Sequence, residues 1–155
     1  MIFKTNKHDI NLYNTLLSLS RNIFFYREIK LSDTFETRVY LMLFHFSIIL
    51  KIFQVRKSKF NQKSYDSLFH AIENNLRELG FGDVSVNKKM KDMNKLLYDI
   101  LLKIGETSKN EFKINKKILL KYFKEINEEN IDNYSKFERY FNYFYNFCFE
   151  LPLNN

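Results

Sequence analysis

Apolar residues recur along most of the chain at spacings of three and four, which is the period of an amphipathic helix. In one clear example, Tyr65, Leu68, Ile72, Leu76 and Leu79 share a helical face. The same period predicts helices over residues 9–20, 61–79, 86–104, 110–127 and 131–149. Residues 21–30 are aromatic but too short for this pattern, and we expect an irregular segment there.

Capping residues mark several of the expected helix ends. Asp9 is a suitable N-cap for the first helix, and Ser85 for the helix that begins at residue 86. Asp33 is followed three residues later by Glu36, a capping box that would start the second helix. Gly105 lies where a glycine ends the helix over 86–104.

The second helix, over about 33–56, is apolar on all sides. From Val39 to Leu50 only His45 and Ser47 interrupt an apolar run of twelve residues. A helix that crosses a bilayer needs about 20 such residues. A helix that is hydrophobic all round is otherwise the buried centre of a bundle. We therefore expect the central core helix rather than a membrane span.

The composition agrees with helices. Three glycines and one proline are too few for the turns of a β-sandwich or barrel, and 45% apolar residues suffice for a core. The 155 residues match one domain, with no repeat or linker. The sequence therefore predicts an all-α fold, a single bundle of about six helices over 1–155.

The net charge of +7 is unevenly distributed. Residues 1–65 carry eleven Lys and Arg against four Asp and Glu, whereas the remainder is balanced at fourteen against fourteen. A one-sided basic surface suits nucleic acid, lipid headgroups or an acidic protein. A coding bias towards Lys, Asn, Ile and Phe explains the global excess equally simply, and we favour that explanation.

The chain has a single cysteine, Cys148, which excludes an internal disulfide and a cysteine-based zinc site. The opening residues MIFKTNKHD resemble neither a signal peptide nor a transit peptide. We expect a protein of the reducing cytoplasm.

Catalytic signatures are missing from the sequence. It contains no phosphate-binding P-loop, no H-E-x-x-H and no G-x-S-x-G. A metal site at His45 would need carboxylates from other helices, and a hydrogen-bonded core or partner-facing role is the more frequent one. Asp33, Glu36 and Arg38 could perform acid–base chemistry. A simpler explanation is that acidic side chains in a first helical turn stabilise the helix through its dipole. We expect no catalytic residues, metal or cofactor.

The last helix has more aromatic residues than one core face can use. Phe137, Phe141 and Phe144 belong to a core stripe, and a surplus falls partly elsewhere, at Tyr143, Tyr145, Phe147 and Phe149. Such a surplus suggests a second buried face, against another chain, a membrane or a client. These aromatics are not interleaved with basic residues, so nucleic acid is less favoured.

The stretch GFGD, residues 80–83, holds two of the three glycines. Without a preceding strand it lacks the context of a dinucleotide-binding loop. We expect Gly80 to end a helix in the left-handed conformation, with Phe81 folded onto the core and Gly82 turning the chain. Arg77 is close enough to clamp Asp83.

Three blocks of the sequence resemble the ubiquinol–cytochrome c chaperone family, over about residues 10–104. The first is FFYREIKLSDTFETRVYLMLFHFSIILKIF, where the family residues are Tyr26, Asp33, Thr34, Arg38 and His45. The second is LRELGFGDVSVNKKMK, with Leu76, Arg77, Glu78, Gly80, Gly82, Asp83, Lys88, Met90 and Lys91. The third is represented by Leu97 and Tyr98. The chain departs from the family at Ala71 and Glu73, in place of two aspartates, and at Asp99 and Ile100, in place of Gly-Arg.

The resemblance implies a non-enzymatic factor that assists assembly of the ubiquinol–cytochrome c reductase. The implied client is newly made cytochrome b or another reductase subunit, with a small helical partner protein and the ribosome as further partners and no DNA. It also implies a bacterial-type protein peripheral to the cytoplasmic face of the inner membrane. The candidate binding residues are Tyr26, Asp33, Thr34, Arg38, His45, Arg77, Glu78, Gly80, Phe81, Gly82, Asp83, Lys88 and Lys91.

Two alternatives stay open on the residues alone. One is a small metal- or haem-handling bundle with a site around His45, and the other is a peripheral membrane or nucleic-acid binder that uses the basic half. On the chaperone hypothesis, a groove beside the central helix and the GFGD turn would hold hydrophobic client segments.

Overall fold

The computed structural model describes residues 12–108, 111–127 and 131–151. Residues 12–20 are helical, and the elements that follow are α2 (Ile23–Arg27), α3 (Phe35–Val55), α4 (Gln62–Glu78), α5 (Asp83–Lys103), β1 (Gly105–Ser108), β2 (Glu111–Ile114), α6 (Lys116–Tyr122) and α7 (Ile131–Glu150). The expected helices over 61–79 and 131–149 are therefore confirmed nearly to the residue. The expected cap at Asp9 lies outside the described residues.

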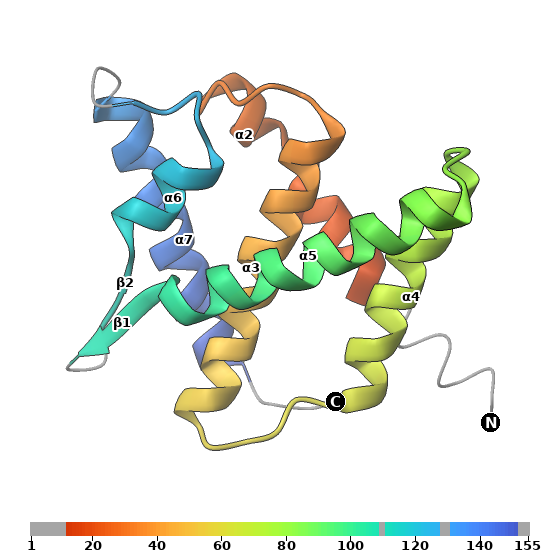
Figure 1. The fold of residues 1–155 in the computed structure, drawn as a ribbon. Helices are drawn as coiled ribbons and strands as arrows, with labels where there is room; N and C mark the ends of the chain where they lie inside the picture. The colour runs from red at the N-terminus through yellow and green to blue at the C-terminus, as the bar shows by residue number, and fades with distance from the viewer. Residues whose placement is uncertain (1–11, 109–110, 128–130, 152–155) are drawn as a thin grey trace.

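Helix α3 is the centre of the bundle. Every residue from Leu41 to Ile48 is buried, as the all-round apolar sequence of this helix requires. Helix α5 crosses in front of α3, while α4 lies to one side and α6, α7 and the hairpin lie to the other (Figure 1). The all-α bundle around a central apolar helix is confirmed.

The same helix is the one candidate for a membrane span in the described part of the chain. By length and composition alone α3 could cross a bilayer, but half of its most apolar window is buried inside the fold. Helix α3 packs against α5 and α7, so its apolar surface already has protein partners.

The start of α3 differs from the expected capping box. Thr34, not Asp33, is the N-cap, and its hydroxyl oxygen accepts a hydrogen bond from the backbone N–H of Thr37 at 3.1 Å. The Asp33 carboxylate instead accepts from the Arg38 guanidinium at 2.6 Å. Asp33 therefore forms an ion pair across the first turn, and the next residue, Thr34, caps the helix with its hydroxyl.

Two other predictions, one of a helix start and one of an irregular segment, were wrong. Helix α5 begins at Asp83 with Gly82 as its N-cap, so Ser85 lies inside the helix and does not cap it. The segment 21–30, expected to be irregular, contains α2, whose N-cap Asn22 accepts from the N–H of Phe24 at 3.0 Å.

A β-hairpin replaces the first part of the helix expected over 110–127. Strands β1 and β2 pair antiparallel, from Gly105 opposite Ile114 to Ser108 opposite Glu111. Along β2 the residues alternate between exposed and buried, and the buried ring of Phe112 stacks on Tyr145 at 4.3 Å. The sequence predicts a helical period for these apolar residues, but in the structure the period is two.

Gly105 opens β1 and does not act as a helix terminator. A Cβ at this position would lie 2.4 Å from the carbonyl oxygen of Lys113 and 2.7 Å from the ring of Phe112. The glycine is therefore required by the close approach of the two strands rather than by a left-handed backbone. Helix α6 then starts after Asn115, whose side chain accepts from the N–H of Lys117 at 2.8 Å.

Candidate functional site

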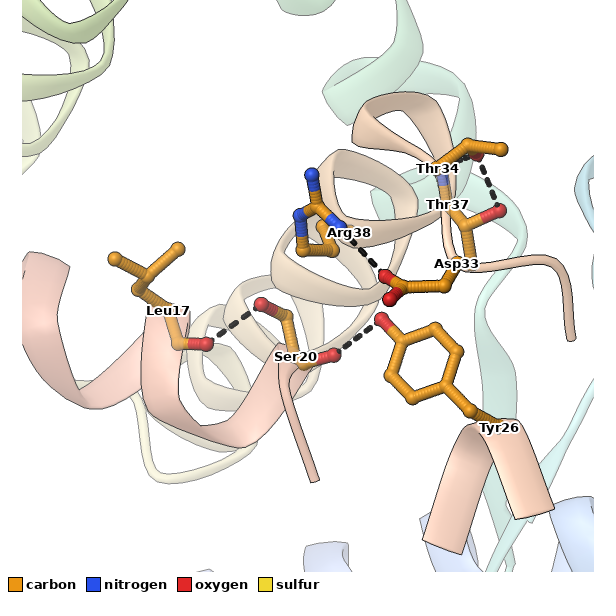
Figure 2. A network of polar contacts seen from close by, with 7 residues as sticks. All are labelled: Leu17, Ser20, Tyr26, Asp33, Thr34, Thr37 and Arg38. Carbon is orange, nitrogen blue, oxygen red and sulfur yellow. Dashed lines mark hydrogen bonds and ion pairs between the residues drawn. The ribbon is translucent and has the colours of Figure 1, made fainter. Parts of the chain in front are cut away.

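The first family-like block builds a polar network at the start of α3 (Figure 2). The Tyr26 hydroxyl, from α2, donates to the carbonyl oxygen of Ser20 at 2.7 Å, and the Ser20 hydroxyl donates to the carbonyl oxygen of Leu17 at 2.7 Å. Burial raises the pKa of Tyr26, and the nearby Asp33 carboxylate raises it further. Tyr26 thus joins α2 to the helical residues 12–20 as a neutral donor.

The other members of this block fix the first turn of α3. Thr34 caps the helix and also donates its hydroxyl to that of Thr37 at 2.9 Å. Arg38 lies over the turn and pairs with Asp33, a contact between half-buried and exposed side chains. The four residues Tyr26, Asp33, Thr34 and Arg38 are therefore brought together, and their contacts shape the end of the bundle.

His45 lies apart from that network, fully buried in the core. Its Nδ1 is 2.6 Å from the carbonyl oxygen of Leu41, and its Nε2 is 2.7 Å from the hydroxyl of Tyr140. Since a carbonyl oxygen only accepts, Nδ1 bears the proton and Nε2 accepts from Tyr140. Burial lowers the pKa of His45 to about 4, so the ring is neutral. In this position His45 holds α3 to α7 and does not reach the surface.

The second block forms the turn between α4 and α5, and Gly80 has the expected left-handed conformation, with φ of 97°. The N–H of Gly80 donates to the carbonyl oxygen of Arg77 at 3.0 Å, and the N–H of Phe81 donates to that of Leu76 at 3.3 Å. These two hydrogen bonds are the Schellman pattern that ends a helix.

Arg77 joins the two helices that this turn connects. Its guanidinium donates to the Asp83 carboxylate at the start of α5, and to Glu73 of α4 at 2.9 Å. The clamp on Asp83 is therefore present, although one guanidinium bridges two carboxylates instead of pairing twice with one. The hydrogen bonds that its guanidinium donates to Glu73 and Asp83 raise the pKa of Arg77. Glu78 is exposed beside it.

Phe81 does not fold onto the core as expected. Its side chain is 38% exposed, and the ammonium of Lys89 lies 4.7 Å from the ring centre. Leu79, 57% exposed, extends the apolar surface of the turn. Gly82 has an ordinary extended backbone with open space where a Cβ would point, so no steric demand keeps a glycine there.

An open groove of about 850 Å³ runs between the start of α3, the turn and α5. Its apolar surface comes from Phe35, Val39, Tyr40, Leu76, Phe81, Met93 and Leu96, and its polar groups from Thr34, Glu36, Lys89, Asp92 and Lys95. Sites of this size that are mainly apolar with a few charged groups bind ligands or peptide segments. The groove has the composition needed to hold an apolar segment with polar ends.

A smaller cavity of about 140 Å³ adjoins the groove through Phe35, Val39 and Met93, which line both. Arg38 from the first block and Leu79 from the second also line it. The two blocks, far apart in the sequence, thus border two adjoining hollows. The spacing of Phe35 and Val39 would have indicated the groove face of α3, but nothing local indicated that α5 lies opposite.

Ten of the thirteen candidate residues, all but Thr34, Arg38 and Phe81, line neither hollow. Lys88 and Lys91 are exposed on α5 but line neither, whereas Lys89 and Lys95, which we had not proposed, line the groove. The packing of α5 as a whole determines which of its residues face the groove. Lysines that are neighbours in the sequence therefore lie on different sides of the helix.

The surplus aromatics of α7 divide into two groups. Tyr145 is buried on Phe112, and Phe149 lies under the Arg56 guanidinium at 4.6 Å. Tyr143 and Phe147 remain exposed.

Burial raises the pKa of the Cys148 thiol to about 11, which keeps it protonated. No group of three or more His, Cys, Asp or Glu that could hold a metal occurs among the described residues.

Comparison with protein families finds a match to the model described as ubiquinol-cytochrome C chaperone, over residues 27–111. The match covers more than half of the chain, and it includes the start of α3, the α4–α5 turn and all of α5. Comparison with curated proteins and with solved structures finds no match.

Proposed function

The chain belongs to the ubiquinol–cytochrome c chaperone family, and from that premise we propose that it is a non-enzymatic assembly factor that holds newly made cytochrome b. The family supports a chaperone role in the assembly of respiratory complex III. The protein would work at the membrane surface, where its client is inserted.

The observation that carries the proposal is the groove between α3 and α5. Its walls come from the family-matched part of the chain: Thr34 and Phe35 on one side, Phe81 in the turn, and Met93 on α5. The apolar side chains would cover a hydrophobic client segment until the segment reaches its place in the reductase. Such burial removes apolar surface from water without any directional bond, so it tolerates varied sequences.

The charged side chains at the rim of the groove suit the two ends of a helical client segment. Glu36 and Asp92 offer carboxylates, and Lys89 and Lys95 offer ammonium groups, all around the same groove. A short helix carries partial positive charge at its start and partial negative charge at its end. A rim with both signs therefore suits a helical segment lying along the groove.

The first test is deletion of the gene. We expect lower cytochrome b and lower reductase activity, with the other respiratory complexes unchanged. Unchanged reductase in the deletion strain would refute the proposed function.

A pair of point variants then tests the groove. Phe81→Asp places a charge on its wall and should fail to restore the reductase in the deletion strain. Ile23→Asp is the matched control, because Ile23 is an exposed apolar residue on α2 outside the groove. Equal rescue by the two variants would show that the groove is not the client site.

Crosslinking gives a direct readout. A photoreactive phenylalanine analogue at position 81 should form an adduct with cytochrome b, and the same analogue at position 23 should not. Adducts with a different reductase subunit would identify that subunit as the client in place of cytochrome b. The absence of any reductase adduct at position 81 would contradict the proposal.

A further inference from the structure

Helix α5 presents a stripe of six exposed residues along its outer side: Val84, Lys88, Lys91, Lys95, Tyr98 and Leu102. Their spacing alternates between four and three, so they follow one face of the helix over about 27 Å. We call this set the α5 stripe. Figure 1 shows α5 at the front of the bundle, crossing α3, and the opposite side of α5 provides buried residues such as Val86 and Met93.

The ends of the α5 stripe are unusually exposed apolar side chains. Val84 is 87% exposed, Tyr98 is 60% exposed and Leu102 is 83% exposed. Exposing apolar surface to water is unfavourable. Three such residues on one helical face therefore suggest an interaction surface that is covered by a partner or a membrane.

The middle of the α5 stripe is positively charged. Two of the three acidic residues of α5 are already paired: Asp83 with Arg77, and Asp99 with both Lys103 at 2.8 Å and Lys121 at 2.7 Å. The third, Asp92, lines the groove beside the stripe.

The stripe lysines keep their positive charge available for a partner. Lys88, Lys91 and Lys95 form no ion pair within the described part of the chain. Their ammonium groups are therefore free to meet anions outside the protein.

We infer that the α5 stripe is the surface by which the protein lies on an anionic lipid bilayer. Lysines are depleted in protein–protein interfaces, which disfavours a second copy of this chain or another protein. The stripe has no arginine, the residue with the fork geometry preferred for nucleic-acid phosphates. Lysines that reach headgroups, flanked by tyrosine and aliphatic side chains, suit the membrane interface.

The inference rests on the proposed function in one respect, since the reductase that the family serves is a membrane complex. It adds the orientation. Lys95 belongs to the α5 stripe and also lines the groove, so a bilayer under the stripe would bring the groove beside the lipid surface. A client segment would then leave the groove directly into the membrane.

The test is co-sedimentation of the purified protein with vesicles of phosphatidylcholine, with and without phosphatidylglycerol. We expect binding only to the anionic vesicles, and weaker binding at higher salt. The triple variant Lys88→Gln, Lys91→Gln, Lys95→Gln should lower the partition coefficient on the order of 100-fold, about fivefold for each lysine. Circular dichroism would check that the variant is folded.

A matched control removes the same charge elsewhere. Lys59→Gln, Lys63→Gln, Lys124→Gln changes three exposed lysines outside the α5 stripe and should lose much less binding. Equal losses in the two triple variants would overturn the inference, because binding would then follow net charge and not the stripe.

A fluorescence measurement separates lipid from nucleic acid. The chain contains no tryptophan, so Val84→Trp introduces a single reporter. Its emission should shift to the blue with anionic vesicles, whereas Lys59→Trp should not shift. Tight binding to RNA that requires the stripe lysines, without a shift on vesicles, would also overturn the inference.

These outcomes are independent of the proposed function. Vesicle binding is measured on the purified protein without any client, and the deletion phenotype does not depend on how the protein meets lipid. A protein that binds vesicles through the α5 stripe but does not affect the reductase would refute only the chaperone role.

Discussion

Replacing Gly80 with alanine separates the backbone conformation of the α4–α5 turn from its packing. Gly80 has a φ of 97°, and nothing lies within 4 Å of the point where a Cβ would be placed. A methyl group there would meet no neighbour. The whole effect of the substitution therefore comes from forcing an L-residue into a left-handed conformation.

The expected cost is about 1–2 kcal/mol, the usual difference for an L-residue in this region. It applies as long as the two hydrogen bonds of the turn, from Gly80 to Arg77 and from Phe81 to Leu76, are kept. For a protein of this size the cost corresponds to a fall in the midpoint of thermal unfolding of about 2–8 °C. Gly80→Asn should cost less, because asparagine tolerates this conformation better.

Gly82 is the matched control, two residues away. Its φ of −73° and ψ of 166° are accessible to any residue, and a Cβ would again meet nothing within 4 Å. Gly82→Ala should change the stability by less than about 0.5 kcal/mol, because a less flexible unfolded chain offsets a slightly poorer cap. Gly82→Ser should stabilise by up to about 1 kcal/mol, since a hydroxyl would cap α5.

The assay is urea-induced unfolding followed by far-ultraviolet circular dichroism on all four variants. The reasoning is refuted if Gly80→Ala is as stable as the wild type. It is also refuted if Gly82→Ala loses as much as Gly80→Ala, because the loss would then come from reduced flexibility of the turn in general.

Three further predictions concern the start of α3, the core and the hairpin. Thr34→Ala should destabilise by about 1 kcal/mol through loss of the cap, while Asp33→Ala, which removes an exposed ion pair, should cost less than about 1 kcal/mol; equal urea midpoints would contradict this assignment. Burial lowers the pKa of His45 from 6.5 in the unfolded chain to about 4, so the unfolded state binds more protons between these values and stability falls as the pH decreases through this window. Relative to His45→Gln, the wild type should lose up to about 3 kcal/mol between pH 7 and pH 4, and a difference in free energy of unfolding that does not vary with pH would disprove the buried neutral ring. Gly105→Ala would force a methyl group against the carbonyl oxygen of Lys113 and should cost about 1–3 kcal/mol or more in thermal unfolding, whereas a neutral result would show that the strands separate easily.

Features that depend on local chemistry were predictable. The bounds of α4 and α7 follow from an apolar stripe with a period near 3.6. The left-handed Gly80 follows from the rule that helices end on glycine. The family resemblance was also visible, because its second block lies in one continuous stretch around that turn. In each case the residues that determine the feature are close together in the sequence.

Features that depend on choosing between partners were predicted less well. Asp33 and Thr34 are both good caps, and the choice was made by Arg38, which pairs with Asp33. The residues 111–114 fit either a strand or a helix, and Phe112 was drawn into the strand by Tyr145 of α7. A short segment has too little intrinsic preference to decide, so the tertiary contact decides.

By itself, then, the sequence determined an all-α bundle around the apolar helix α3, the glycine turn after α4, and membership of a chaperone family. The packing of distant elements places His45 against Tyr140, 95 residues away, and so keeps it from the surface. The same packing brings α3 and α5 together around the groove, with Lys89 facing it while Lys88 and Lys91 face outwards. The physical reason is that a helix carries residues on every side, and only the packing of its neighbours selects which side is covered.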